Sequence, residues 1–65
     1  MRSFHVAALY NQSDQLAAVS REVRALVMAS PACRRTGVLL AAKALLSAIY
    51  VERVAIDDEI EGLLE

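Results

Sequence analysis

Few side chains in this sequence have the chemistry that a catalytic or binding site requires, and several of them lie in one short stretch. Residues 30 to 37 read S-P-A-C-R-R-T-G and contain the only proline and the only cysteine of the chain. A thiol at the start of a helix and beside arginines is more reactive than usual, which suits a redox switch or an interchain disulfide at Cys33. We favour a small packing residue at a corner, because no His, Asp or Asn lies nearby to complete a nucleophilic site.

Two charged clusters are the other chemical features. Arg34 and Arg35 suit either a contact to phosphate or an acidic partner, or a solvated corner. Asp57, Asp58 and Glu59 have no companion ligands in the sequence, so we interpret them as a solvated helix face. Arginines near a helix start and acids near a helix end oppose the helix dipole, so helix stability does not explain this layout, whereas pairing between chains would.

The length of the chain limits what it can do alone. A domain of 65 residues is marginally stable unless a disulfide, a metal or a partner supports it. One cysteine forms no internal disulfide, and His5 and Cys33 are too few ligands for structural zinc. The sequence therefore predicts association, with no metal, no cofactor and no enzymatic activity.

Composition favours packed helices and a cytoplasmic location. The chain is 57% apolar but only 5% aromatic, and it contains two glycines and one proline. Its net charge of −1 does not favour nucleic acid as a partner. The longest nearly uncharged run, residues 38–51, is shorter than the roughly 20 residues of a membrane span. Because we also find no convincing signal peptide and no cysteine pair, we expect the cytoplasm.

The first predicted helix covers about residues 13–29. Its larger apolar residues cluster on one stripe at helical spacing, and Ser13 followed by Asp14 suits a helix start. Residues 3–11 fit this register poorly. They are predicted either to extend the helix, to form a separate short helix, or to run as a strand, and we favour helix.

The second predicted helix covers about residues 31–64. Ser30 is a favoured N-cap and Pro31 suits the first helical position, so the corner lies near Ser30-Pro31 and the two helices are antiparallel neighbours. The alternative is a longer loop through Thr36 and Gly37, with Thr36 as the cap. The first half of this helix is apolar nearly all round, so a single partner helix leaves one side uncovered.

The predicted protein interface follows from these stripes, and we expect a second copy of the chain or another helical protein to cover it. Its members are Leu16, Val19, Val23, Leu26, Val38, Leu45, Leu46, Ile49, Ile56, Ile60 and Leu63. Arg53 interrupts the stripe of the second helix. It is predicted either to specify register, with Gln12 as a neighbour, or to lay its stem on the surface.

These features predict an all-α antiparallel helical hairpin, assembling into a dimeric four-helix bundle or into a complex with another helical protein. In length and corner position the chain is similar to small hairpins that dimerise into such bundles, a resemblance that implies architecture alone. If two hairpins pack antiparallel with a midpoint near Ser47, Arg34 and Arg35 lie opposite residues 58–60 of the other chain.

The function predicted from these features is a small non-enzymatic interaction module, an adaptor, antagonist or chaperone that acts through an apolar helix face. The alternative is a DNA-binding dimer of the ribbon-helix-helix type, in which residues 3–10 pair as strands ahead of two helices. Its exposed ribbon face would carry Ser3, His5, Ala7 and Leu9, which offer little for reading a DNA groove.

Overall fold

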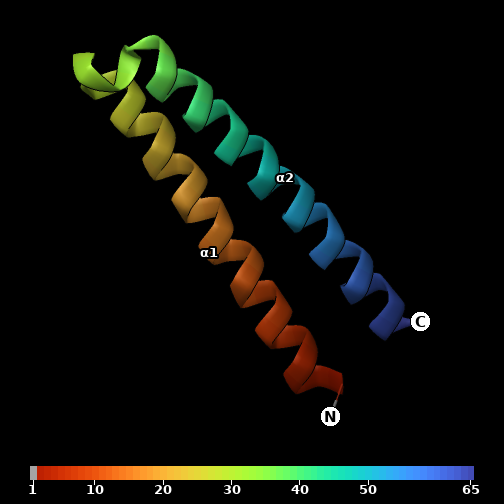
Figure 1. Ribbon diagram of the computed structural model, residues 1–65. Coiled ribbons are helices and arrows are strands. Elements are labelled where there is room, and N and C mark those ends of the chain that lie inside the picture. The colour runs from red at the N-terminus through yellow and green to blue at the C-terminus, as the bar shows by residue number, and fades with distance from the viewer. Residues whose placement is uncertain (1) are drawn as a thin grey trace.

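The computed structural model describes residues 2–65 and shows a helical hairpin. The elements are α1 (Arg2–Ala29), the short 3₁₀ helix η1 (Pro31–Arg34) and α2 (Thr36–Leu64). In Figure 1 α1 and α2 lie side by side in antiparallel orientation, with both chain ends at one end of the hairpin and the connection at the other. Of the described residues 95% are helical, so the predicted all-α hairpin is confirmed.

α1 begins at Arg2, so of the alternatives for residues 3–11 the structure shows an extension of the helix predicted over residues 13–29. Residues 3–11 lie within it, so they form neither a separate short helix nor the strand that a ribbon-helix-helix plan requires. The reason lies in Val6, Leu9 and Ser13, which are spaced three and four residues apart and continue the face turned toward α2. Phe4 and Tyr10, the aromatic residues of this poorly fitting segment, are exposed.

Ser13 is therefore not a helix cap. It lies in the middle of α1 and is 7% exposed. Ser20, one heptad further along, is buried to the same degree. Two small polar residues thus occupy positions of the seam where the sequence pattern favours larger apolar side chains.

The connection between α1 and α2 covers residues 30–35 and is longer than the predicted corner at Ser30-Pro31. Ser30 is extended and Pro31 opens η1, in which the amides of Cys33 and Arg35 donate to the carbonyls of Ser30 and Ala32 at 3.1 and 3.4 Å. Arg35 is extended again, with ψ of 144°, and interrupts the helical path. α2 consequently begins at Thr36 instead of Pro31, closer to the alternative with a longer loop, and neither Ser30 nor Arg35 caps a helix through its side chain.

The seam between the helices has the residue spacing of a two-stranded antiparallel coiled coil. Its residues alternate at spacings of three and four along each helix, and all except Arg53 are buried or half-buried. They are Val6, Leu9, Ser13, Leu16, Ser20, Val23 and Val27 on α1, and Leu39, Ala42, Leu46, Ile49, Arg53, Ile56, Ile60 and Leu63 on α2. The least exposed apolar residues are Leu9 (5%), Ile49 (6%) and Ile60 (4%).

This seam buries little of the molecule. The accessible surface of the hairpin is 5064 Å², whereas a compact monomer of 7.1 kDa has about 4,100 Å². Large apolar side chains are part of this exposed surface. The large apolar side chains that remain exposed are Phe4, Tyr10, Val19, Leu26, Met28, Val38, Leu40, Leu45, Tyr50, Val51, Val54 and Leu64.

Candidate interaction surface

The seam divides the rest of the hairpin into two long faces on opposite sides. The first, which we call the leucine face, combines apolar residues near the connection with polar ones toward the chain ends. It consists of His5, Ala8, Gln12, Gln15, Val19, Glu22, Leu26 and Ala29 from α1, and of Val38, Ala41, Leu45, Ala48, Glu52, Ala55, Glu59 and Gly62 from α2. No lysine or arginine belongs to it.

Near the connection the leucine face carries a groove of about 220 Å³. Leu26 of α1 and Val38 and Leu45 of α2 form its exposed walls, and Cys33 closes one end. Seam residues form its floor, among them Val23 and Val27. An apolar groove between two helices is a typical seat for the apolar stripe of a third helix.

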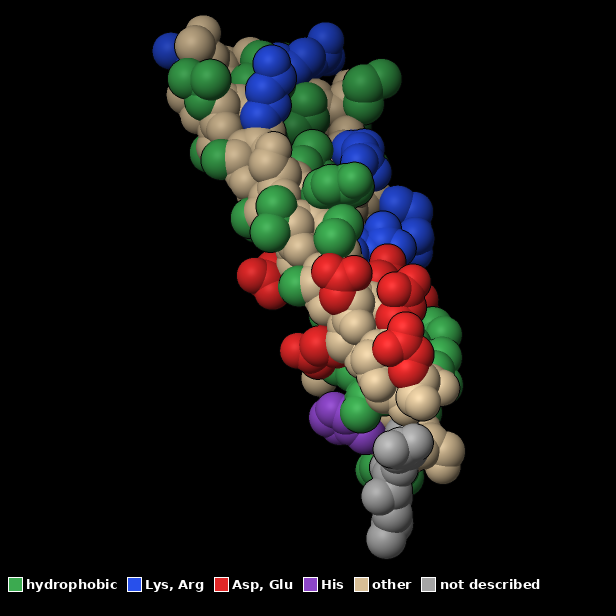
Figure 2. Space-filling model, turned by 90° about the vertical axis from the view of Figure 1, so that its right-hand side faces the viewer, with side chains coloured by type: hydrophobic (Ala, Val, Ile, Leu, Met, Phe, Trp, Pro, Cys, Tyr) green, Lys and Arg blue, Asp and Glu red, His purple; other side chains and the backbone are tan. Residues whose placement is uncertain are grey.

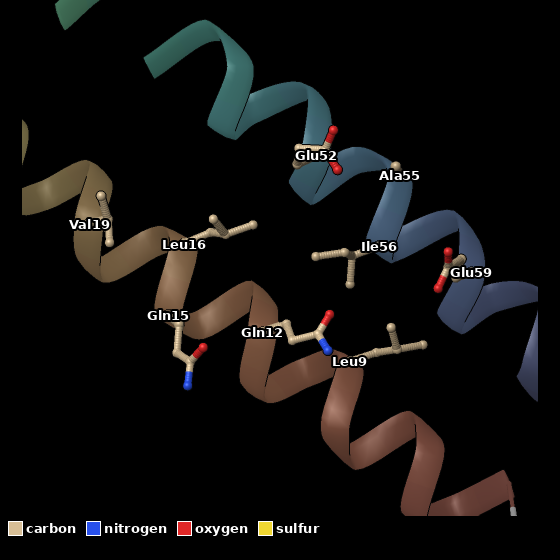
Figure 3. A pocket seen from close by; sticks show the side chains of 9 residues that line it. All are labelled: Leu9, Gln12, Gln15, Leu16, Val19, Glu52, Ala55, Ile56 and Glu59. Atoms are coloured by element: carbon tan, nitrogen blue, oxygen red, sulfur yellow. The ribbon is translucent and has the colours of Figure 1, made fainter. Parts of the chain in front are cut away.

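Toward the chain ends the same face opens into a wider groove of about 540 Å³, shown in Figure 3. Leu16 of α1 and Ile56 of α2 point into the space between the helices, and Gln12 extends toward α2. Glu52 and Glu59 lie on either side of Ile56 along α2. The leucine face therefore continues from an apolar half into an acidic half.

The opposite side, the tyrosine face, has a different composition. It consists of Ser3, Ala7, Tyr10, Asp14, Ala17, Arg21, Arg24 and Met28 from α1, and of Leu40, Lys43, Ser47, Tyr50, Val54, Asp57, Glu61 and Leu64 from α2. It carries a groove of about 280 Å³ between Arg24, Met28 and Lys43, and another of about 490 Å³ beside Tyr10 and Leu64. Charges of both signs and large apolar side chains share this face.

The predicted charge clusters lie apart along the hairpin. Arg34 and Arg35 are exposed at the connection, and Asp57, Asp58 and Glu59 are exposed on the half of α2 near the chain ends. Figure 2 shows the result on one side of the molecule, with Lys and Arg side chains toward the connection and Asp and Glu side chains below them. The basic cluster lies at the connection and the acidic cluster lies near the opposite end of α2, which is one continuous helix. The two clusters of one chain are therefore far apart.

Arg53 lies in the seam but contacts a different residue from the one predicted. Its Nε donates a hydrogen bond of 3.4 Å to Oγ of Ser13, whereas Gln12 lines the groove of the leucine face. The residue remains exposed overall, which fits an aliphatic stem in the seam and a charged head at its edge. The contact shows that Ser13 of α1 and Arg53 of α2 lie at the same height along the hairpin.

An Arg53→Met variant is expected to melt within about 5 °C of the wild type, or higher. A bond of 3.4 Å is long and adds little stability, while a flexible apolar side chain of similar length fits the seam. Thermal unfolding followed by circular dichroism measures the change. A loss of more than about 10 °C would show that Arg53 stabilises the hairpin through its charge.

The predicted interface residues divide into two groups in the structure. Leu16, Val23, Leu46, Ile49, Ile56, Ile60 and Leu63 lie in the seam between α1 and α2. Val19, Leu26, Val38 and Leu45 are exposed on the leucine face. The sequence pattern placed all of them on common stripes and predicted no role for Met28 or the small seam residue Ser20, while Tyr50, which it predicted to be a packing residue, is exposed. The heptad spacing of Ser13 and Ser20 is the signal that could have revealed the seam.

Cys33 lies in η1 instead of in the first turn of α2, and its side chain is half-buried against the apolar groove. A Cys33→Ser variant is therefore expected to keep its helix content and to melt within about 5 °C of the wild type, since it exchanges one small side chain for another. Circular dichroism under reducing conditions measures both. If the variant failed to assemble under those conditions, Cys33 would have a role beyond packing.

Two further properties of residues 2–65 bear on the kind of site. The described side chains include no group of three or more His, Cys, Asp or Glu residues that could hold a metal ion. Neither α1 nor α2 combines the length and the apolar character that crossing a membrane requires. No protein-family model, curated protein sequence or solved structure matches the chain.

Proposed function

We propose that the chain is a small non-enzymatic interaction module, an adaptor, antagonist or chaperone, whose leucine face binds a helix of another protein. The observation that carries this proposal is the pair of grooves on that face, an apolar one beside Leu26 and Leu45 and one flanked by the acidic Glu52 and Glu59. Such a surface suits an amphipathic helix whose apolar stripe is followed by lysine or arginine. The single cysteine supports a reducing compartment, so the cytoplasm is the proposed location.

A second copy of the chain fits this face less well than a different protein. Because the leucine face contains no lysine or arginine, a copy bound through the same face brings no cation to Glu52 or Glu59. Covering these carboxylates without a partner charge costs free energy. A basic amphipathic helix supplies both the apolar stripe and the missing cations.

Two synthetic helical peptides test this proposal. Both carry the same leucine stripe, but one ends in lysines and the other in glutamates. We expect the lysine peptide to bind the hairpin in fluorescence anisotropy and the glutamate peptide to bind at least about tenfold more weakly, because it meets Glu52 and Glu59 with like charge. Equal binding of the two peptides, or no binding of either, would contradict the proposal.

Variants locate the binding site of the lysine peptide. Leu45→Glu is expected to weaken binding at least about a hundredfold, since it places a charge in the middle of the apolar groove. Val51→Glu is the matched control, because Val51 is also an exposed apolar residue of α2 but lies outside both faces. Equal losses in the two variants would place the peptide elsewhere.

A further inference from the structure

The tyrosine face carries half of the large apolar side chains that the hairpin leaves exposed. They are Tyr10, Met28, Leu40, Tyr50, Val54 and Leu64. Tyr50 and Met28 stand out, with 70% and 78% of their surface exposed. This face contains both basic and acidic side chains, whereas the leucine face contains acidic side chains and no lysine or arginine. A surface of this kind can complement itself.

The heights of its residues along the hairpin follow from the grooves. Arg24 and Lys43 line one groove, so they lie at the same height near the connection. Ala17 and Tyr50 lie one heptad, seven residues, further toward the chain ends. Tyr10 and Asp57 lie one heptad beyond them. Ala17 and Tyr50 therefore mark the middle of the face, with cations on one side and acids on the other.

This spacing is symmetric about the middle. Lys43 and Asp57 each lie seven residues from Tyr50, and Arg21 and Asp14 lie on either side of Ala17 on α1. We infer that the tyrosine face binds a second copy of the chain in antiparallel orientation, about a two-fold axis that passes Ala17 and Tyr50. Lys43 of one copy then lies opposite Asp57 of the other, and Arg21 lies opposite Asp14, each pair occurring twice.

The parallel arrangement is unfavourable on the same face. A two-fold axis along the hairpin would place α1 of one copy against α2 of the other at equal heights. Arg24 would then face Lys43 twice, with like charges in contact. The orientation of the dimer is thus selected by charge.

The two most exposed apolar residues of this face, Met28 and Tyr50, fit the antiparallel arrangement as well. Met28 of one copy comes to the height of Ala7 of the other, beside the groove lined by Val6, Tyr10 and Leu63. A long, exposed, flexible side chain therefore meets a small residue and an open apolar groove. The two Tyr50 rings meet near the axis.

The dimensions of the hairpin suffice for a stable contact. Its principal extents are 46, 16 and 11 Å, and the tyrosine face runs along its length. A contact over one such face buries on the order of 700 Å² on each copy, close to the about 800 Å² per partner of standard protein interfaces. The midpoint lies at Tyr50, not near Ser47 as expected from sequence, so Arg35 comes to lie opposite Glu65 instead of residues 58–60.

Tyr50→Glu tests this dimer by analytical ultracentrifugation of the full chain. The substitution places two carboxylates at the axis, so we expect dimerisation to weaken at least about a hundredfold. Val51→Glu, the next residue and also exposed, should leave the dimer intact. Leu45→Glu on the leucine face should also leave it intact, which separates this inference from the proposed function.

A charge exchange tests the orientation. Lys43→Asp alone should weaken the dimer about tenfold, because both copies of the pair become repulsive, and Lys43→Asp with Asp57→Lys should restore it. Within one helix the two residues are about 21 Å apart, beyond the screening length at physiological salt, so rescue inside one chain is excluded. At about 1 M salt the difference between single and double variants should disappear.

Three results would overturn the inference. The first is a wild-type chain that stays monomeric at micromolar concentrations. The second is a Tyr50→Glu variant that remains dimeric while Leu45→Glu dissociates, because the leucine face is then the dimer interface. The third is a double charge variant that binds itself no better than Lys43→Asp alone, which excludes the antiparallel pairing.

Discussion

An Ile49→Asp variant is expected to lose helical structure and self-association together. Ile49 is 6% exposed and lies in the middle of the seam, so the substitution buries an unpaired charge between α1 and α2. The cost is several kcal/mol, while a domain of 65 residues has a total stability of only about 3–10 kcal/mol. Circular dichroism and sedimentation measure the two losses, and Leu46→Asp, in the same seam, should behave alike.

Ala44→Asp is the matched control for this experiment. Ala44 is exposed on the outer side of α2, so its replacement costs only the difference in helix propensity, about 0.6 kcal/mol. We expect it to remain folded. If Ile49→Asp were as helical and as stable as Ala44→Asp, the seam would not be what holds the two helices together.

Dilution is expected to lower the melting temperature of the wild-type chain. The hairpin alone exposes about 1,000 Å² more than a compact monomer of its mass, so much of its stability should come from association. Each tenfold dilution of a dimer that unfolds to monomers removes about 1.4 kcal/mol, which for two such chains corresponds to about 5 °C. Thermal melts over a hundredfold concentration range measure the slope.

The Tyr50→Glu variant supplies the comparison for this slope. It should melt at a lower temperature that does not change with concentration, because only the isolated hairpin remains. A wild-type melting temperature that is equally independent of concentration, with cooperative unfolding, would mean that the hairpin is stable as a monomer.

The sequence predicted the hairpin and most of the α2 half of its seam. Ile49, Ile56 and Ile60 are large apolar residues at helical spacing, and burial of such residues decides how a helix packs. The sequence left the start of α1 open among three alternatives, because Ser13 also suits a helix cap. A serine suits a helix start locally, and only the contact with Arg53 of α2 shows why it lies inside the helix instead.

The assignment of residues to the two sides of the hairpin was harder to predict. A helix of 3.6 residues per turn drifts by about 20° per heptad relative to a coiled-coil seam, so a stripe drawn at 100° per residue merged Val19 and Leu26 with the seam. The heights of Lys43 and Arg24 depend on the length of the connection, which the extended Arg35 changes. Neither the leucine face nor the tyrosine face could therefore be defined from periodicity alone.

The hairpin is thin, 11 Å in its shortest direction, and this shape bears on how many partners it can bind at once. The leucine and tyrosine faces point in opposite directions, so occupation of one leaves the other open. A dimer closed through its tyrosine faces displays two leucine faces on its outer sides, running in opposite directions. If both the proposed dimer and the proposed helix binding hold, one dimer would bridge two helices of separate molecules or bind two helices of one partner, and would thereby act as a cross-linker.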